Sequence, residues 1–146
     1  MSAASNYLEN ELLDHVLGEN GKNFTPPSNL YLALFTSDGG LEANDSSSFT
    51  EISTSGSAYA RKNIDVDGSS GAFGNASGGS ASNTQTITFT AATSNWGTVT
   101  HVAIMDSADS SGTNNVLFHG AVTTSKTIES GDTFQVSASN LTITLA

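Results

Sequence analysis

The fold is decided by residues 95–106, which read NWGTVTHVAIMD. Between Gly97 and Asp106 every side chain is β-branched or apolar apart from one histidine, and this composition is typical of a β-strand. Strict alternation divides the apolar side chains between two faces, with Val99, Ala103 and Met105 on one and Val102 and Ile104 on the other. A strand that is apolar on both faces is typical of the centre of a covered sheet. We therefore expect residues 98–105 to form a central strand.

Several other segments have the composition of strands and are separated by polar turns. They are residues 30–35, 58–66, 84–90, 116–122, 126–128, 133–136 and 141–145. The segment 116–122 follows a turn-rich stretch directly after the first strand, so we expect the two to pair as a hairpin. Because strands recur about every 10 residues and the chain has one helical segment, the pattern predicts a mainly β fold. We expect an antiparallel β-sandwich, jelly-roll-like, with one N-terminal α-helix.

The helical segment lies at the N-terminus. Asn6 is suited to cap a helix that begins at Tyr7, and Gly18 is suited to end it. The apolar residues expected on one face of this helix are Leu8, Leu12, Leu13 and Val16. Two interpretations fit the pattern: the stripe packs onto the sheet of the same domain, or the helix is an arm that docks onto a neighbouring chain.

The length of 146 residues fits one folded domain. We divide the chain into an N-terminal helix or arm at residues 1–22 and a single β-sandwich domain at residues 23–146. Residues 67–83 form a Gly/Ser-rich loop within that domain, with Phe73 as its aromatic side chain. We expect Phe73 to anchor this loop against a sheet or against another subunit.

The charge balance is strongly acidic. Four Lys and Arg residues face 14 Asp and Glu residues, which gives a formal net charge of -10. Such a surface repels phosphate, so we predict no binding to nucleic acid or to a membrane, whereas a basic protein partner would be attracted. No apolar run approaches the roughly 20 residues of a membrane span, and we recognise no signal peptide. The lack of cysteine excludes disulfides and thiolate metal sites.

Catalytic chemistry finds no support in the sequence. The chain has no G-x-S-x-G nucleophile elbow. His101 and His119 lie in expected strands, where a hydrogen-bonded or interface histidine is more common than a catalytic base. The two could share a metal only with a third ligand, and none is patterned nearby. We therefore predict no enzyme activity, no catalytic residue, no cofactor and no metal site.

A further set of segments spans nearly the whole chain: NYLEN at 6–10, LLDH at 12–15, LYLALFT at 30–36, YAR at 59–61, WGTVTH at 96–101, LFHG at 117–120, KTI at 126–128 and GDTF at 131–134. As a set, they resemble a family of small structural proteins from the virions of tailed bacteriophages, of the capsid cement or tail-fibre-like kinds. The Gly/Ser-rich loop at 67–83 lies outside this resemblance. The resemblance implies a non-enzymatic component of the virion.

Two placements follow from the resemblance. In the first, the protein is a capsid cement or decoration protein, a homo-trimer made in the host cytoplasm that binds the major capsid protein on the capsid exterior and stabilises the shell. In the alternative, it belongs to the tail or a tail fibre, although a fibre usually has a longer shaft than this length provides. A carbohydrate-binding β-sandwich is a third hypothesis. It predicts a cluster of exposed aromatic side chains, which the pattern does not contain.

The residues that we expect to contact a partner come from three parts of the chain. They are Tyr7, Leu8, Leu12, Phe73, His101 and His119. The first three belong to the N-terminal helix, the next to the Gly/Ser-rich loop, and the histidines to the expected central hairpin.

Overall fold

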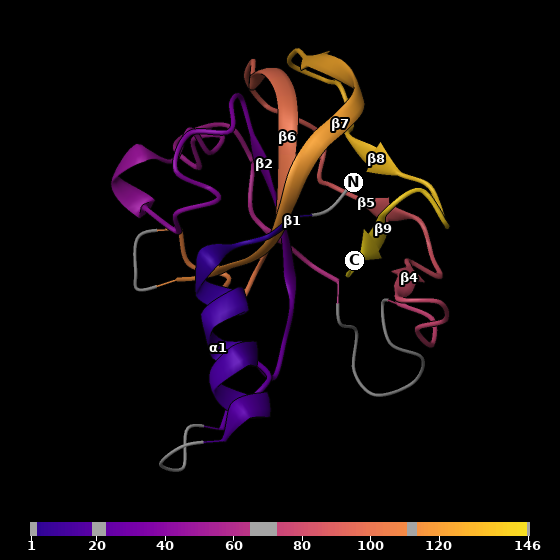
Figure 1. Cartoon of the computed structure of the whole chain (residues 1–146). Coiled ribbons are helices and arrows are strands. Elements are labelled where there is room, and N and C mark those ends of the chain that lie inside the picture. The colour runs from indigo at the N-terminus through magenta and orange to yellow at the C-terminus, as the bar shows by residue number, and fades with distance from the viewer. Residues whose placement is uncertain (1–2, 19–22, 65–72, 111–113, 146) are drawn as a thin grey trace.

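The computed structural model describes residues 3–18, 23–64, 73–110 and 114–145 (Figure 1). It is mainly β, with antiparallel sheets and one α-helix, α1 (Asn6–Leu17), which confirms the predicted fold class. A short 3-10 helix, η1 (Ser46–Ser48), is the other helical element of this described part. Figure 1 shows α1 projecting downward from the main sheet, with the smaller strands to the right of that sheet.

The main sheet has five strands in the order β1, β7, β6, β2 and β3. Their bounds are β1 Ala3–Ala4, β2 Tyr31–Phe35, β3 Lys62–Asn63, β6 Gly97–Met105 and β7 Val116–Ile128. All neighbouring pairs are antiparallel, and β6 pairs with β7 as the predicted hairpin partner. The position of β6 in the middle of the sheet confirms the prediction from its two apolar faces.

Two small sheets cover one face of the main sheet. They are β4 (Ser80–Ser82) with β9 (Thr142–Thr144), and β5 (Ile87–Thr88) with β8 (Gln135–Val136). Apolar residues of and beside these strands share one buried cluster, here called the main core, with Leu32, Leu34, Val102 and Ile104 of the main sheet. The domain therefore has two layers of strands around a shared core, which is a sandwich-like arrangement.

The other face of the main sheet is covered by residues 36–51, which contain η1. A second, smaller core joins Phe35 and Met105 on the sheet with Leu41 of this covering segment. Phe49 packs edge-on against Phe35, with ring centroids 5.7 Å apart. These buried contacts fix the covering segment across the sheet.

A bulge in the pairing of β6 with β7 changes one detail of the predicted central strand. Residues 122–125 of β7 lie opposite Thr100 alone. The irregularity shifts the alternation of side chains, so Val99 is buried in the main core with Val102. The prediction that Val99 shares a face with Met105 is wrong, because strict alternation holds only in a strand without a bulge.

Trp96 anchors the entry of β6. Its indole Nε1–H donates to the carbonyl oxygen of Ser57 at 2.8 Å. Its ring meets that of Tyr59 edge to face, with centroids 5.4 Å apart. Gly97 follows with a φ of 82°, a left-handed conformation that favours glycine. The strand therefore starts from a fixed point in the main core.

Several predicted strands are shorter in the structure, and the two that lose the most residues are those predicted at 58–66 and 84–90. Within residues 58–64 only Lys62–Asn63 is a strand, and within residues 84–90 only Ile87–Thr88 is one. Residues 65–66, at the end of the first of these predictions, lie outside the described part. Residues at the predicted boundary between arm and domain also lie outside it, so that division stays a prediction.

The side chain of Asn83 explains why no ladder continues from β4 into β5. Asn83 is buried, and its Nδ2 donates to the carbonyl oxygen of Ser137 at 3.0 Å. Its Oδ1 accepts the backbone N–H of Leu141 at 2.8 Å. A side chain that takes up backbone partners in this way replaces ladder hydrogen bonds and interrupts the strand.

Candidate functional site

The start of α1 is tied to the main sheet by Ser5. The side chain of Ser5 accepts the N–H of Leu8 at 3.3 Å, which is the geometry of an N-cap. Its hydroxyl also donates to the carbonyl oxygen of Val116, and its own N–H donates to that of Leu117 at 3.0 Å. The prediction of Asn6 as the cap is wrong, because the pairing of β1 with β7 brings Ser5 to the buried end of the helix.

The inward face of α1 packs on the chain's own core. Leu8 is only 4% exposed and belongs to the main core, and Tyr7 and Leu12 are half-buried against it. Burial, together with the carboxylates of Glu11 and Asp106, raises the pKa of the Tyr7 phenol. Three of the predicted partner contacts therefore lie between the helix and its own domain, and their role toward a partner stays a prediction.

The outward face of α1 carries exposed apolar side chains. Leu13 is 57% exposed, and Val16 and Leu17 are each 75% exposed. The only other large apolar side chain of the described part with comparable exposure is Leu145. Leu8 and Leu13 lie about 140° apart around a helix, so the prediction of one stripe that joins them is wrong. The first half of the helix therefore packs on its own domain, as the first interpretation predicts, and the side chains of Leu13, Val16 and Leu17 in the second half are exposed. Docking of the helix onto a neighbouring chain stays a prediction.

His101 and His119 lie on neighbouring strands beneath the covering segment, where Asp38 approaches both. One carboxylate oxygen of Asp38 is 3.3 Å from Nδ1 of His119 and 4.0 Å from Nε2 of His101. Glu42 accepts the Nε2–H of His119 at 2.9 Å, since an ionised carboxylate can only accept. His119 is 5% exposed, and its Nδ1 makes no hydrogen bond within the described part. The cluster joins the covering segment to the sheet through carboxylate and imidazole groups.

Sequence reasoning brought the two histidines together but missed Asp38 and Glu42. Both acidic residues come from the covering segment, far from the hairpin in sequence, and no spacing links them to it. The isolated apolar residues Leu41 and Phe49 were the available signal, because such anchors mark a segment that crosses a core. Among the residues that the structure describes, no three or more His, Cys, Asp or Glu side chains are arranged to hold a metal ion.

Phe73 is half-buried against the main core and forms an isolated β-bridge with Asn83. This contact fits the expected role of Phe73 as an anchor of the Gly/Ser-rich loop. Ser80–Ser82, which falls inside the loop predicted at residues 67–83, is strand β4 and pairs with β9. Residues 67–72 lie outside the described part.

A small apolar cavity lies beside Phe73. Its volume is about 240 Å³, and its wall includes Leu30, Phe118 and Leu145. Its lining is almost entirely apolar, so it offers no group for polar recognition or catalysis.

A larger groove of about 640 Å³ runs between β7 and β8, at the end of the molecule away from α1 (Figure 1). The bulge at 122–125 contributes to one wall and Gln135 to the other. Hydroxyl and amide groups dominate the polar lining, with one cation and one carboxylate, Lys126 and Asp132. Phe134 also lines the groove but is buried, and no aromatic side chain in the described part is fully exposed. The cluster of exposed aromatic rings that a carbohydrate-binding sandwich predicts is therefore not found in these residues.

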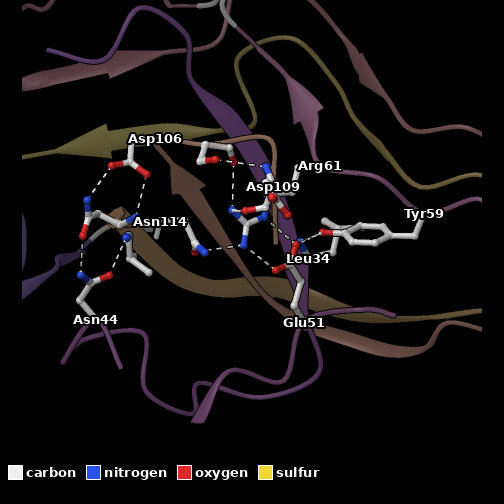
Figure 2. Close-up of polar contacts among 11 residues, drawn as sticks. Leu34, Asn44, Glu51, Tyr59, Arg61, Asp106, Asp109 and Asn114 are labelled. Atoms are coloured by element: carbon white, nitrogen blue, oxygen red, sulfur yellow. Dashed lines mark hydrogen bonds and ion pairs between the residues drawn. The ribbon is translucent and has the colours of Figure 1, made fainter. Parts of the chain in front are cut away.

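Arg61 is the centre of a buried polar network beside the turn between β6 and β7 (Figure 2). Its Nε and Nη2 donate to the two carboxylate oxygens of Glu51 at 2.8 and 2.7 Å. Its remaining donors reach the carbonyl oxygens of Ser107 and Asp109 at 3.0 and 3.2 Å and the side chain of Asn114 at 3.2 Å. All five N–H donors of the guanidinium are thus engaged inside the protein, so Arg61 holds the turn in place and presents no free charge to a ligand.

A second network ties the same turn to the covering segment (Figure 2). Asn44 donates through Nδ2 to Oδ1 of Asn115 at 2.9 Å and accepts the N–H of Val116 at 2.8 Å. The carboxylate of Asp106 accepts the backbone N–H and the Nδ2–H of Asn115, each at 2.7 Å. Polar groups that satisfy one another in this way are typical of structural clusters.

A family model described as "Podophage GP4 fiber I protein gp80" matches residues 3–144 of the chain. The chain belongs to this family. The match runs from β1 to β9 and includes α1, so it covers the fold and the candidate surfaces together. Membership in the gp80 family confirms the predicted resemblance to phage virion structural proteins. No curated protein matches the chain. Neither α1 nor η1, the helices of the described part, has the length and hydrophobicity that a bilayer-spanning helix needs.

Proposed function

We propose that the chain is a non-enzymatic structural component of the phage tail fibre. The observation that carries this proposal is the gp80 family match over residues 3–144, whose description names a fibre protein. That description favours the tail-fibre alternative over the capsid cement role. The binding of a major capsid protein on the capsid exterior has no comparable support.

The geometry of the domain supports a structural role. The Arg61 and Asn44 networks lock the turn between β6 and β7, and the histidine cluster joins the covering segment to the sheet. These polar side chains serve the fold itself, which suits a component that must keep its shape within an assembly.

The two ends of the molecule differ in a way that suits a fibre component. The outward face of α1 offers apolar side chains at one end, and the groove between β7 and β8, which combines apolar side chains with hydroxyl and amide groups, opens at the other (Figure 1). An apolar surface suits permanent attachment, whereas a hydroxyl-lined surface suits exposure to water. We infer that the α1 end is attached to the particle and that the groove end is presented outward.

Localisation on the intact virion tests this proposal. Gold-labelled antibodies raised against the purified chain are applied to purified virions and imaged by electron microscopy. Particles from a phage in which the gene for this chain is disrupted serve as the control for specificity. Label along the tail fibres is the expected result, and label distributed over the capsid shell would contradict the proposal. The homo-trimer stays a prediction, which sedimentation of the purified chain tests separately.

A further inference from the structure

We propose that the outward face of α1, formed by Leu13, Val16 and Leu17, docks into an apolar groove with a basic rim on a different protein of the virion. The inference rests on the proposed structural role in the particle, and it adds the contact residues and the chemistry of the partner. It concerns the second half of the helix, not the inward residues Tyr7, Leu8 and Leu12.

The outward face concentrates exposed apolar surface. Three of the four exposed large apolar side chains of the described part lie on it, within five consecutive residues. Leu13 and Leu17 are one turn apart, with Val16 between them, so the three side chains form one continuous patch. Isolated exposed leucines are ordinary, but a cluster on one helix face marks an interaction surface.

The helix is held so that this patch projects from the domain. Ser5 and Leu8 fix its first turn to β7 and the main core. Gly18 ends it with a φ of 64°, and apart from its chain neighbours no atom of the described residues lies within 4 Å of where a Cβ on that residue would be. A 12-residue helix is marginal in isolation, so anchoring at one end is what keeps the projecting half helical before a partner binds. A preformed helix loses little conformational entropy on docking.

The size of the patch argues against a flat contact with a second copy of the chain. A specific interface buries about 800 Å² on each partner, which is far more than three aliphatic side chains supply. A groove that encloses the helix also contacts its flanks and therefore buries enough surface. We therefore expect α1 to be the element that inserts and the partner to provide the groove.

The charges near the patch indicate a basic partner. Glu9 lies one turn before Leu13 on the same side of the helix, and α1 carries Glu11 and Asp14 but no Lys or Arg. Two copies that met through this face would bring their carboxylates together on chains with a formal net charge of -10. A groove rimmed by Lys or Arg pairs with Glu9 and is attracted to the acidic domain.

Complementation of a phage in which the gene for this chain is disrupted tests the proposal. Plasmid-borne chains are supplied during infection, and their copies per purified particle are counted by quantitative mass spectrometry. The variant Leu13→Gln/Val16→Gln/Leu17→Gln keeps residues with good helix propensity and removes the apolar patch. We expect its incorporation to fall about tenfold or more, as for loss of an interface hot spot. Leu145→Gln, which changes the remaining exposed leucine, is the matched control and should be incorporated like the native chain.

Three results would overturn the proposal. The first is undiminished incorporation of the triple variant, with its native fold verified by circular dichroism and its unfolding midpoint. The second is equal incorporation of Glu9→Lys and of the control Glu129→Lys, since this result would show that the groove of the partner has no basic rim beside Glu9. The third is a native chain whose self-association in sedimentation is abolished by the triple variant, since a second copy would then be the occupant. Label on the capsid with a strong effect of the triple variant would refute the fibre role alone and leave the docking surface intact.

Discussion

The two halves of α1 have the same helical geometry but opposite surroundings. The first half, Asn6 to Leu12, is capped by Ser5 and places Leu8 in the main core, whereas the second half holds Leu13, Val16 and Leu17 in solvent. The hydrophobicity of the residues does not separate them, because leucine occurs in both halves. The comparison teaches that the first half stabilises the domain and that the second half is available for a partner.

The largest difference between the halves is expected from alanine substitutions of their leucines. Leu8→Ala removes a buried side chain and leaves a cavity in the main core, so the free energy of unfolding should fall by about 2–5 kcal/mol. Leu13→Ala removes an exposed side chain and should change it by less than about 0.5 kcal/mol. Urea denaturation measures both. Equal losses for the two variants would contradict the division of the helix.

The cap of the helix gives the next largest effect. Ser5→Ala removes the acceptor for the N–H of Leu8 and the donor to Val116, so the free energy of unfolding should fall by about 0.5–2 kcal/mol. Asn6→Ala is the control, because Asn6 is exposed and its backbone N–H, not its side chain, bonds to Glu42. If Asn6→Ala proved the more damaging of the two in urea denaturation, Ser5 would not be the cap.

The pH dependence of stability sharpens the description of the inward face. Burial and the carboxylates of Glu11 and Asp106 raise the pKa of Tyr7 above the ordinary value of 10.0. Above that pH the unfolded chain loses the phenol proton before the folded chain does, so the contribution of Tyr7 is complete below pH 10.0 and is lost as the pH rises further. Tyr7→Phe should make the fall in stability above pH 10.0 less steep. An unchanged slope in urea denaturation across this range would place Tyr7 in solvent.

The smallest effect is expected at the free end of the helix. Gly18→Ala places a side chain at a φ of 64°, which is strained for alanine, so the last turn of α1 should lose helical content. Because residues 15–18 are exposed, the free energy of unfolding should change by less than about 0.5 kcal/mol. Circular dichroism and urea denaturation measure the two quantities. A loss of stability as large as that of Leu8→Ala would show that the end of α1 is packed.

Local patterns in the sequence predicted the features that depend on neighbouring residues. The two apolar faces of β6, its pairing with β7 and the end of α1 at Gly18 are of this kind. The remaining features depend on segments that meet only in the folded chain. The bulge opposite Thr100 places Val99 on the face of the main core. The pairing of β1 with β7 positions Ser5 as the N-cap of α1. The covering segment places Asp38 beside the two histidines. The outward patch was missed because helical periodicity was applied to a single stripe rather than to two faces.

A reconstruction of the whole virion at side-chain resolution tests the central claim most directly. We predict that the chain lies in the tail fibre, with Leu13, Val16 and Leu17 enclosed by a groove of another virion protein and a Lys or Arg of that groove beside Glu9. A chain on the capsid shell whose outward α1 face stands in solvent would contradict this account.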